Sequence, residues 1–175
     1  EQYGTALCRF LRQMQTDLPV DTIYFGGGTP SLLSVSLLEE ILQTIDKTVS
    51  LQQPEITLEC NPATVNRKTL QQLREIGINR LSIGVQSLSD VQLKRLGRLH
   101  DAKTAIETVE QAAAVGFQNL SCDVMLALPK QTTAELQGTL TQLTALTHTQ
   151  RFGLSVKSRA ENAVCIHELG AAAAG

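Results

Sequence analysis

The sequence GINRLSIGVQ, residues 77–86, returns with the same order of residue types as GFQNLSCDVM at residues 116–125. Each copy starts with a glycine, which suits the left-handed residue that ends a helix, and continues into a segment typical of a buried strand. The chain is therefore expected to contain two successive units of a helix followed by a strand. Repeated units whose strands look continuously apolar favour a parallel sheet covered by helices.

The same alternation continues on both sides of these two units. Apolar residues spaced by three or four predict helices, and short apolar or alternating runs predict strands. Asp101 is expected to cap a helix, and Thr132 and Glu135 stand at the spacing of a capping box. Further helices are expected at residues 3–14, 37–45 and 70–76, and further strands at residues 21–25, 55–60 and 151–156.

About five strands result, and this number leaves two architectures open. An open doubly wound sheet needs a reversal in strand order, whereas a complete barrel needs about eight strand–helix units and roughly 250 residues. A barrel built from this chain would therefore be incomplete. In both architectures, ligands bind at the carboxyl ends of the strands.

The composition restricts the class of protein. The chain has 175 residues, of which 42% are hydrophobic, and a net charge of -2. It is long enough for one well-buried domain and is not basic, so nucleic acid is not expected as a partner. No apolar stretch is long enough for a transmembrane segment, and the first residues do not resemble a signal peptide. We expect a cytoplasmic protein, with an organelle left open.

The four cysteines, Cys8, Cys60, Cys122 and Cys165, lie far apart in the sequence. None forms the close pair that zinc and iron–sulfur sites use, so no metal ligand is assigned. Single cysteines usually behave as small buried hydrophobic residues, and this is the role expected for these four.

Polar residues and glycines stand where the predicted strands end. Asp123 interrupts an apolar run, and a buried carboxylate is costly unless hydrogen bonds or a cation compensate it, so Asp123 needs a partner. Ligand binding is favoured over an anchoring role because other polar groups converge on the same rim of the sheet. The candidate site residues are Gly26, Gly27, Gly28, Thr29, Glu59, Gln86 and Asp123.

The type of ligand stays open at this point. Two acids and an amide suit hydroxyl and amino groups, whereas tandem glycines after a strand are also typical of a phosphate nest. The sequence lacks the Gly-Lys-Ser/Thr of a phosphate loop, and a glycine ridge can equally press against an uncharged or cationic ligand. Arg98 could hold a ligand carboxylate or be a surface arginine, and His100 beside it is expected to be structural or exposed.

Four segments carry a resemblance to a known family: FGGGTPSLL at residues 25–33, LECNP at 58–62, GINRLSIGVQSLSDVQLKRLGRLH at 77–100 and CDVMLALPKQT at 122–132. In this order they resemble the radical S-adenosylmethionine (SAM) proteins related to oxygen-independent coproporphyrinogen III oxidase, and the HemW-type branch in particular. The resemblance implies an α/β fold, a partial (β/α) TIM-like barrel of parallel strands. It assigns residues 1–157 to the radical SAM core and residues 158–175 to a divergent or disordered tail.

The resemblance also implies a role for each candidate residue. Residues 26–29, the three glycines and the threonine after them, would pack against the methionine part of SAM. Glu59 would bind a polar group of this cofactor, with Gln86 close to it. Arg98 would hold the methionine carboxylate, and Asp123 would accept hydrogen bonds from the ribose hydroxyls.

The family's chemistry follows from a second cofactor. A 4Fe-4S cluster donates an electron to the SAM sulfonium, and homolysis gives a 5′-deoxyadenosyl radical in a site that must exclude water. The related oxidase uses this radical to decarboxylate porphyrinogen propionates, whereas HemW-type proteins are thought to bind haem and pass it on. The resemblance therefore implies SAM, a 4Fe-4S cluster and haem or a porphyrin as ligands, and haem-accepting proteins as partners.

The sequence departs from the family because it lacks the Cys-x-x-x-Cys-x-x-Cys loop that holds the cluster. We expect a fragment whose first barrel strand and C-terminal domain are missing, so the cluster ligands are absent and no catalytic residue is assigned. The chain alone is expected to be inactive and to expose the sheet edge at residues 23–25. Two alternatives stay open: a haem chaperone without SAM turnover, and an unrelated phosphate-binding barrel enzyme.

Overall fold

The computed structural model describes residues 2–14, 19–146, 151–158 and 164–166. They contain one six-stranded sheet in which β1 to β5 are parallel and lie in sequence order, while β6 pairs antiparallel with β5. The strands are Val20–Phe25 (β1), Leu51–Cys60 (β2), Arg80–Gln86 (β3), Asn119–Leu126 (β4), Arg151–Ser158 (β5) and Val164–Ile166 (β6).

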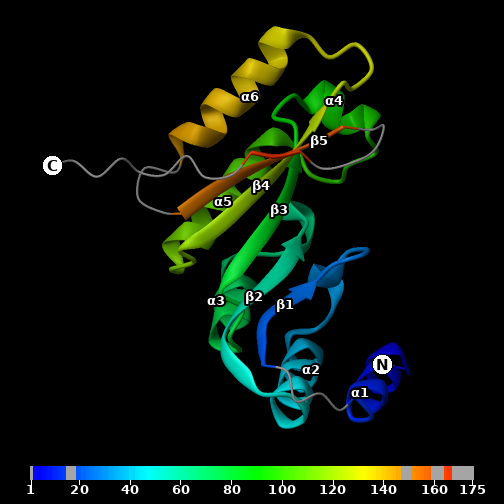
Figure 1. Ribbon diagram of the computed structural model, residues 1–175. Coiled ribbons are helices and arrows are strands. Elements are labelled where there is room, and N and C mark those ends of the chain that lie inside the picture. Colours follow the sequence, from blue (N-terminus) through cyan, green and yellow to red (C-terminus); the bar gives the residue numbers. More distant parts are fainter. Residues whose placement is uncertain (1, 15–18, 147–150, 159–163, 167–175) are drawn as a thin grey trace, which may run out of the picture.

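Helices connect the parallel strands and lie along one side of the sheet (Figure 1). At one end of the molecule, α1 packs on α2, where a side chain at Gly4 would collide with Leu37. The α-helices are Gln2–Leu11 (α1), Val35–Thr48 (α2), Arg67–Glu75 (α3), Asp90–Arg95 (α4), Ala102–Ala114 (α5) and Thr133–Ala145 (α6). Two short 3-10 helices, Pro30–Leu32 (η1) and Pro62–Thr64 (η2), follow β1 and β2.

The strand order decides between the two architectures expected from the sequence. Each parallel strand is added beside the preceding one, and the described strands β1 to β5 contain no reversal in order. A doubly wound sheet requires such a reversal, so this alternative is wrong. The prediction of an α/β fold with a partial (β/α) barrel of parallel strands is confirmed.

Local signals in the sequence place the helix ends correctly. The Thr104 backbone N–H donates a hydrogen bond of 2.7 Å to Asp101 Oδ1 at the start of α5. Thr132 and Glu135 form the predicted capping box at the start of α6. Gly77 ends α3 with a φ of +104°, a conformation that favours glycine. The short helix α4 was not predicted.

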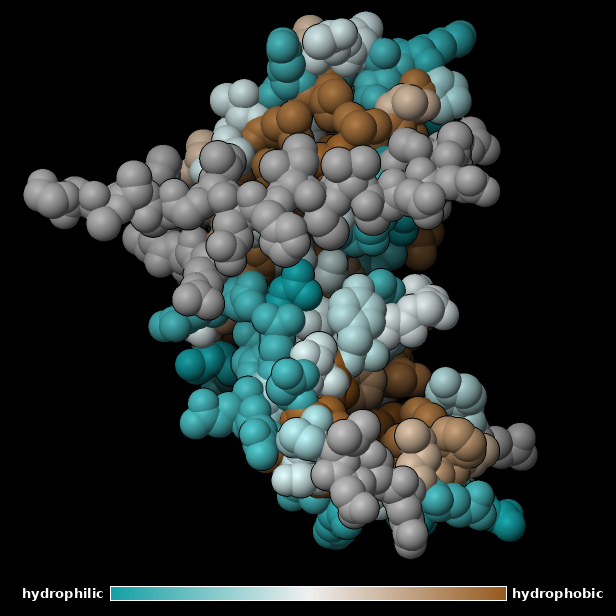
Figure 2. All heavy atoms as spheres, in the orientation of Figure 1, coloured by the Kyte–Doolittle hydropathy of each residue, from teal (hydrophilic) through white to brown (hydrophobic). Residues whose placement is uncertain are grey.

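The hydrophobic core lies between the sheet and the helices. Alternate strand residues such as Leu58, Leu81 and Leu120 are fully buried, and they belong to one cluster with Leu38 of α2 and Leu143 of α6. The expectation of continuously apolar strands is therefore wrong, because the residues between these positions are largely polar. Figure 2 shows hydrophilic residues across the middle of the face in view, with hydrophobic areas nearer its two ends.

Three of the four cysteines, Cys8, Cys60 and Cys122, are buried and unpaired, as expected. Burial raises the pKa of the Cys60 thiol to about 12 and also raises the pKa of Cys122, so both stay neutral near pH 7. Cys165 lies on β6, whose side chains are outside the described part. Among the described residues, no three His, Cys, Asp or Glu side chains come together as a set that could hold a metal ion.

The two edge strands of the sheet, β1 and β6, relate to the expected exposed edge and to the expected C-terminal tail. β1 is an edge strand that pairs only with β2 in the described ranges, which agrees with the exposed edge expected at residues 23–25. β6 falls within the tail expected at residues 158–175, and most of that segment lies outside the described residues, so the domain boundary stays a prediction. No helix in the described part is both long and apolar enough to cross a bilayer.

Candidate functional site

The side of the sheet opposite the helices carries polar side chains, and we call it the polar face. These side chains come from alternate positions of β1 to β5, so they share one side of the sheet. Several of them are buried. The residues of the polar face are Tyr24, Glu55, Thr57, Glu59, Arg80, Ser82, Asn119, Ser121, Asp123 and Lys157, which are linked by hydrogen bonds and ion pairs.

The glycine turn follows β1 at the carboxyl end of the sheet. A side chain at Gly26 would collide with the Tyr24 ring, and its first carbon would lie 3.1 Å from the carboxyl carbon of Glu59. Gly27 has a φ of +84°, and nothing lies within 4 Å of the position where its side chain would begin. Residues 27–29 are exposed, and the main chain of Gly27 and Gly28 is therefore open to solvent.

Glu59 is held by Tyr24 on the neighbouring strand. The Tyr24 hydroxyl donates a hydrogen bond of 2.8 Å to Glu59 Oε1. The pKa of Tyr24 is raised to about 12, chiefly by burial of its hydroxyl, although about half of the residue is exposed. The hydrogen bond to Glu59 and the negative charges of Glu59 and Asp123 raise it further. Tyr24 therefore stays a neutral donor and fixes one oxygen of Glu59.

Asp123 is buried on β4 and has the partners that its position requires. Its Oδ1 atom accepts a hydrogen bond of 3.3 Å from the Ser82 hydroxyl of β3. Its Oδ2 atom lies 2.8 Å from the Lys157 ammonium nitrogen of β5. Lys157 was not identified from the sequence, although the alternation of residues 153–157 as a strand could have placed it on the same face as Asp123.

Gln86 ends β3 in an unusual backbone conformation. Its φ is +67°, in the left-handed region that residues with side chains rarely adopt, and the residue is 8% exposed. Its Nε2 atom lies 3.0 Å from the position that a side chain at Gly84 would occupy, so the glycine makes room for the amide. Backbone strain of this kind concentrates at ligand-binding sites.

Arg98 and His100 lie in the loop between α4 and α5. Arg98 is partly buried, and none of the described residues forms a hydrogen bond or ion pair with its guanidinium group. His100 is buried, and its Nε2 atom lies 3.2 Å from the Val85 carbonyl oxygen. Burial lowers the pKa of His100, which favours a neutral ring that donates to this carbonyl. His100 was expected to be structural or exposed, and it is buried.

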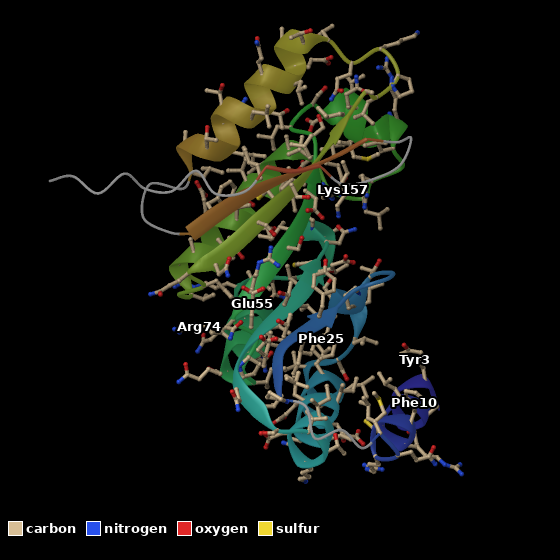
Figure 3. The ribbon with its side chains drawn as sticks, in the orientation of Figure 1. Tyr3, Phe10, Phe25, Glu55, Arg74 and Lys157 are labelled. Atoms are coloured by element: carbon tan, nitrogen blue, oxygen red, sulfur yellow. The ribbon has the colours of Figure 1, made fainter. Side chains whose placement is uncertain are left out.

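A second set of contacts lies at the amino half of the polar face. Arg80 donates hydrogen bonds to Thr57 at 3.3 Å and to Ser121 at 3.4 Å, and its guanidinium lies 3.7 Å from Glu55. Asn119 donates to Glu55 at 3.0 Å. These contacts join β2, β3 and β4 nearer to the amino ends of the strands than Glu59 and Asp123. Figure 3 labels Glu55, which belongs to this set, and Lys157, which lies apart from it on β5.

Most of the predicted residues gather at one rim. Gly26 lies beside Glu59. Ser82 of β3 is the register partner of Glu59 and donates a hydrogen bond to Asp123. Gln86 is the last residue of β3. Within the described part of the chain, Arg98 forms no hydrogen bond or ion pair with either carboxylate. The rim offers carboxylate oxygens, an amide and bare main chain, a combination that binds hydroxyl and amino groups.

Sequence comparison places this chain in a family. The Radical SAM superfamily model matches residues 9–143. The chain is 37% identical over 142 residues to the heme chaperone HemW of Synechocystis, a match that covers 80% of this chain and 34% of that protein. It is 40% identical over 126 residues to the mitochondrial radical S-adenosyl methionine domain-containing protein 1 of Bos taurus, covering 69% of this chain and 28% of that one. The chain thus spans about a third of the length of these relatives.

A solved structure agrees with this placement. Coproporphyrinogen III oxidase (HemN) of Escherichia coli, a radical SAM enzyme, superposes with a TM-score of 0.81 at 27% identity, and the match covers 91% of this chain and 37% of that chain. The chain therefore belongs to the radical SAM superfamily, within which it is HemW-like.

Proposed function

We propose that this chain binds SAM at the carboxyl ends of β1 to β4, as part of a cytoplasmic HemW-like protein that handles haem or a porphyrin. The observation that supports this proposal best is the order of groups along the rim: Gly26 lies beside Glu59, and Ser82, the register partner of Glu59, donates to Asp123. Membership of the radical SAM superfamily supports the choice of SAM among ligands with amino and hydroxyl groups.

Each candidate residue has a chemical match in SAM. The exposed main chain of residues 26–29 would pack against the methionine part, and the second oxygen of Glu59 would accept a hydrogen bond from a polar group of the cofactor. Gln86 would lie beside it. Asp123 would accept from the ribose hydroxyls, and Arg98 would reach the methionine carboxylate from its loop.

The two family cofactors differ in how well this chain fits them. The rim fits SAM, which supplies a 5′-deoxyadenosyl group when bound in a radical SAM protein. The donor set does not fit a 4Fe-4S cluster, because Cys8, Cys60 and Cys122 are buried separately and the sequence holds no cysteine triplet. No redox step is therefore assigned to residues of this chain.

A second candidate function is haem binding without SAM turnover. It is supported by the names of the HemW relatives, which are heme chaperones. In that case SAM would occupy the rim without being cleaved. Haem-accepting proteins would then be the partners of the whole protein.

The test is a ligand panel on the 175-residue chain. Isothermal titration calorimetry should detect binding of SAM and of S-adenosylhomocysteine, and only weak binding of inorganic phosphate or a sugar phosphate. A haem titration followed by absorbance tests the second candidate on the same sample. Protection from thermal unfolding by phosphate esters, and not by SAM, would overturn the proposal in favour of a phosphate-binding barrel.

A further inference from the structure

We propose that Lys157 is a positioning residue that orients the Asp123 carboxylate for the two ribose hydroxyls of the nucleoside. The inference rests on the proposed function, because it assumes that Asp123 faces a diol. Lys157 itself would not touch the ligand. It would act through the carboxylate.

The register of β4 and β5 brings the two charges together. Asp123 pairs with Ser155, and Met125 pairs with Lys157, so the lysine lies two residues further along the sheet on the same face. Its side chain reaches back to place Nζ 2.8 Å from Asp123 Oδ2. Figure 3 labels Lys157 on β5.

The two partners differ in solvent exposure, and this difference decides which of them depends more on the ion pair. The Asp123 side chain is 9% exposed, whereas the Lys157 side chain is 42% exposed. A buried carboxylate is strongly disfavoured without a compensating charge, whereas a half-exposed ammonium group is also solvated by water. Asp123 therefore depends on Lys157 more than Lys157 depends on Asp123.

The two donors also fix the plane of the carboxylate. Ser82 donates to Oδ1 from β3, and Lys157 donates to Oδ2 from β5, so the group is held from both neighbouring strands. An ionised carboxylate has about four acceptor positions, two on each oxygen. Counting the donors from the described residues only, one position on each oxygen is left, which matches the two hydroxyl donors of a vicinal diol.

Among the described residues, Lys157 is the only cation that forms an ion pair with Asp123. Arg80 is the other basic residue of the polar face, and its guanidinium is engaged by Thr57, Ser121 and Glu55. Asp123 is also close enough to Tyr24 for its charge to act on the hydroxyl that Glu59 accepts from. Removing Lys157 would leave Asp123 without an ion-pair partner among the described residues.

The experiment separates this role from a merely structural one by varying the diol. Affinities of the 175-residue chain are measured for S-adenosylhomocysteine and for its 2′,3′-dideoxy analogue, in the wild type, Lys157→Met and Lys157→Arg. We expect Lys157→Met to weaken binding of the diol ligand about tenfold, the scale of a charge-assisted hydrogen bond, with the dideoxy ligand changed less than about twofold. Lys157→Arg should keep most of the discrimination.

The control is Lys103→Met, which removes another lysine that forms an ion pair, with Glu107 at 3.7 Å on the exposed side of α5. It should leave both affinities unchanged. Equal losses for both ligands in Lys157→Met, or no loss for either, would overturn the positioning role. Circular dichroism shows whether Lys157→Met is folded. If it is not, the test rests on Lys157→Arg: a folded Lys157→Arg protein that no longer discriminates between the two ligands would also overturn the positioning role. Failure of the wild type to bind either ligand would instead reject the proposed function, and the inference with it.

Discussion

The Tyr24 hydroxyl donates a hydrogen bond of 2.8 Å to Glu59 Oε1, although 35 residues separate the two in the sequence. The contact spans β1 and β2 directly beside the glycine turn, since Gly26 packs against both side chains. One carboxylate oxygen is thereby fixed before a ligand arrives. Preorganised acceptors bind more tightly because less ordering is needed on binding.

Tyr24→Phe should therefore weaken SAM binding, because Glu59 loses the donor that orients it. The expected loss is about 0.5–1.5 kcal/mol, the usual net value of one hydrogen bond. Calorimetric titration of SAM into both proteins measures it. Tyr3→Phe is the matched control, since Tyr3 lies exposed on α1 and should change nothing. Equal SAM affinities for wild type and Tyr24→Phe would show that Glu59 needs no such support.

The raised pKa of Tyr24 predicts a loss of stability at high pH. The folded pKa of about 12 lies above the ordinary value of 10.0, so the neutral hydroxyl contributes stability that is complete below pH 10. This contribution should be lost as the pH rises from 10 to 12. Urea unfolding at pH 9 and pH 11 should show a steeper decline for wild type than for Tyr24→Phe, and the comparison cancels effects of Cys60, whose pKa is also raised to about 12. Parallel declines would contradict the prediction.

Asp123→Ala should weaken SAM binding by on the order of 1–3 kcal/mol, because the ribose hydroxyls lose a charged acceptor. The substitution also leaves Lys157 without its partner, so thermal unfolding should be measured beside affinity. Asp46→Ala, on the exposed side of α2, is the control for removing a carboxylate elsewhere. Unchanged SAM affinity in a folded Asp123→Ala protein would remove Asp123 from the site.

Arg98→Ala tests the one predicted residue that the described contacts do not join to the rim. If Arg98 holds the methionine carboxylate, the substitution should weaken the binding free energy by about 1–3 kcal/mol for SAM. For adenosine, which has no carboxylate, the binding free energy should hardly change. Arg67→Ala, at the exposed start of α3, should affect neither ligand. A similar loss for SAM and adenosine would mean that Arg98 acts on the loop and not on the carboxylate.

The sequence predicted the fold well because its signals are local. The glycines that end α3 and α5, the Asp101 cap and the capping box of Thr132 act within a few residues. The strand order followed once the helices were placed, since sequential strands usually lie side by side. The helix α4 was missed because six residues show too little of a helical period.

The sequence predicted only some residues of the candidate site, because contacts in the site depend on residues that are far apart in the sequence. A carboxylate in a buried strand needs a partner, so Asp123 could be recognised from the sequence alone. Its partner Lys157 lies 34 residues away, and the ion pair depends on the register of β4 and β5, which the sequence does not show. The positive φ of Gln86 was equally invisible, because glutamine gives no sign of backbone strain.

The bare main chain of the glycine turn should be required for SAM binding. Gly27→Val should block SAM binding, because its side chain would enter the open space that a ligand needs, while secondary structure stays largely intact. The φ of +84° adds backbone strain of about 1–2 kcal/mol for any residue with a side chain. Gly77→Val is the control, since Gly77 also has a positive φ but lies at the amino end of β3. A Gly27→Val protein that binds SAM as well as Gly77→Val does would mean that the turn faces away from the ligand.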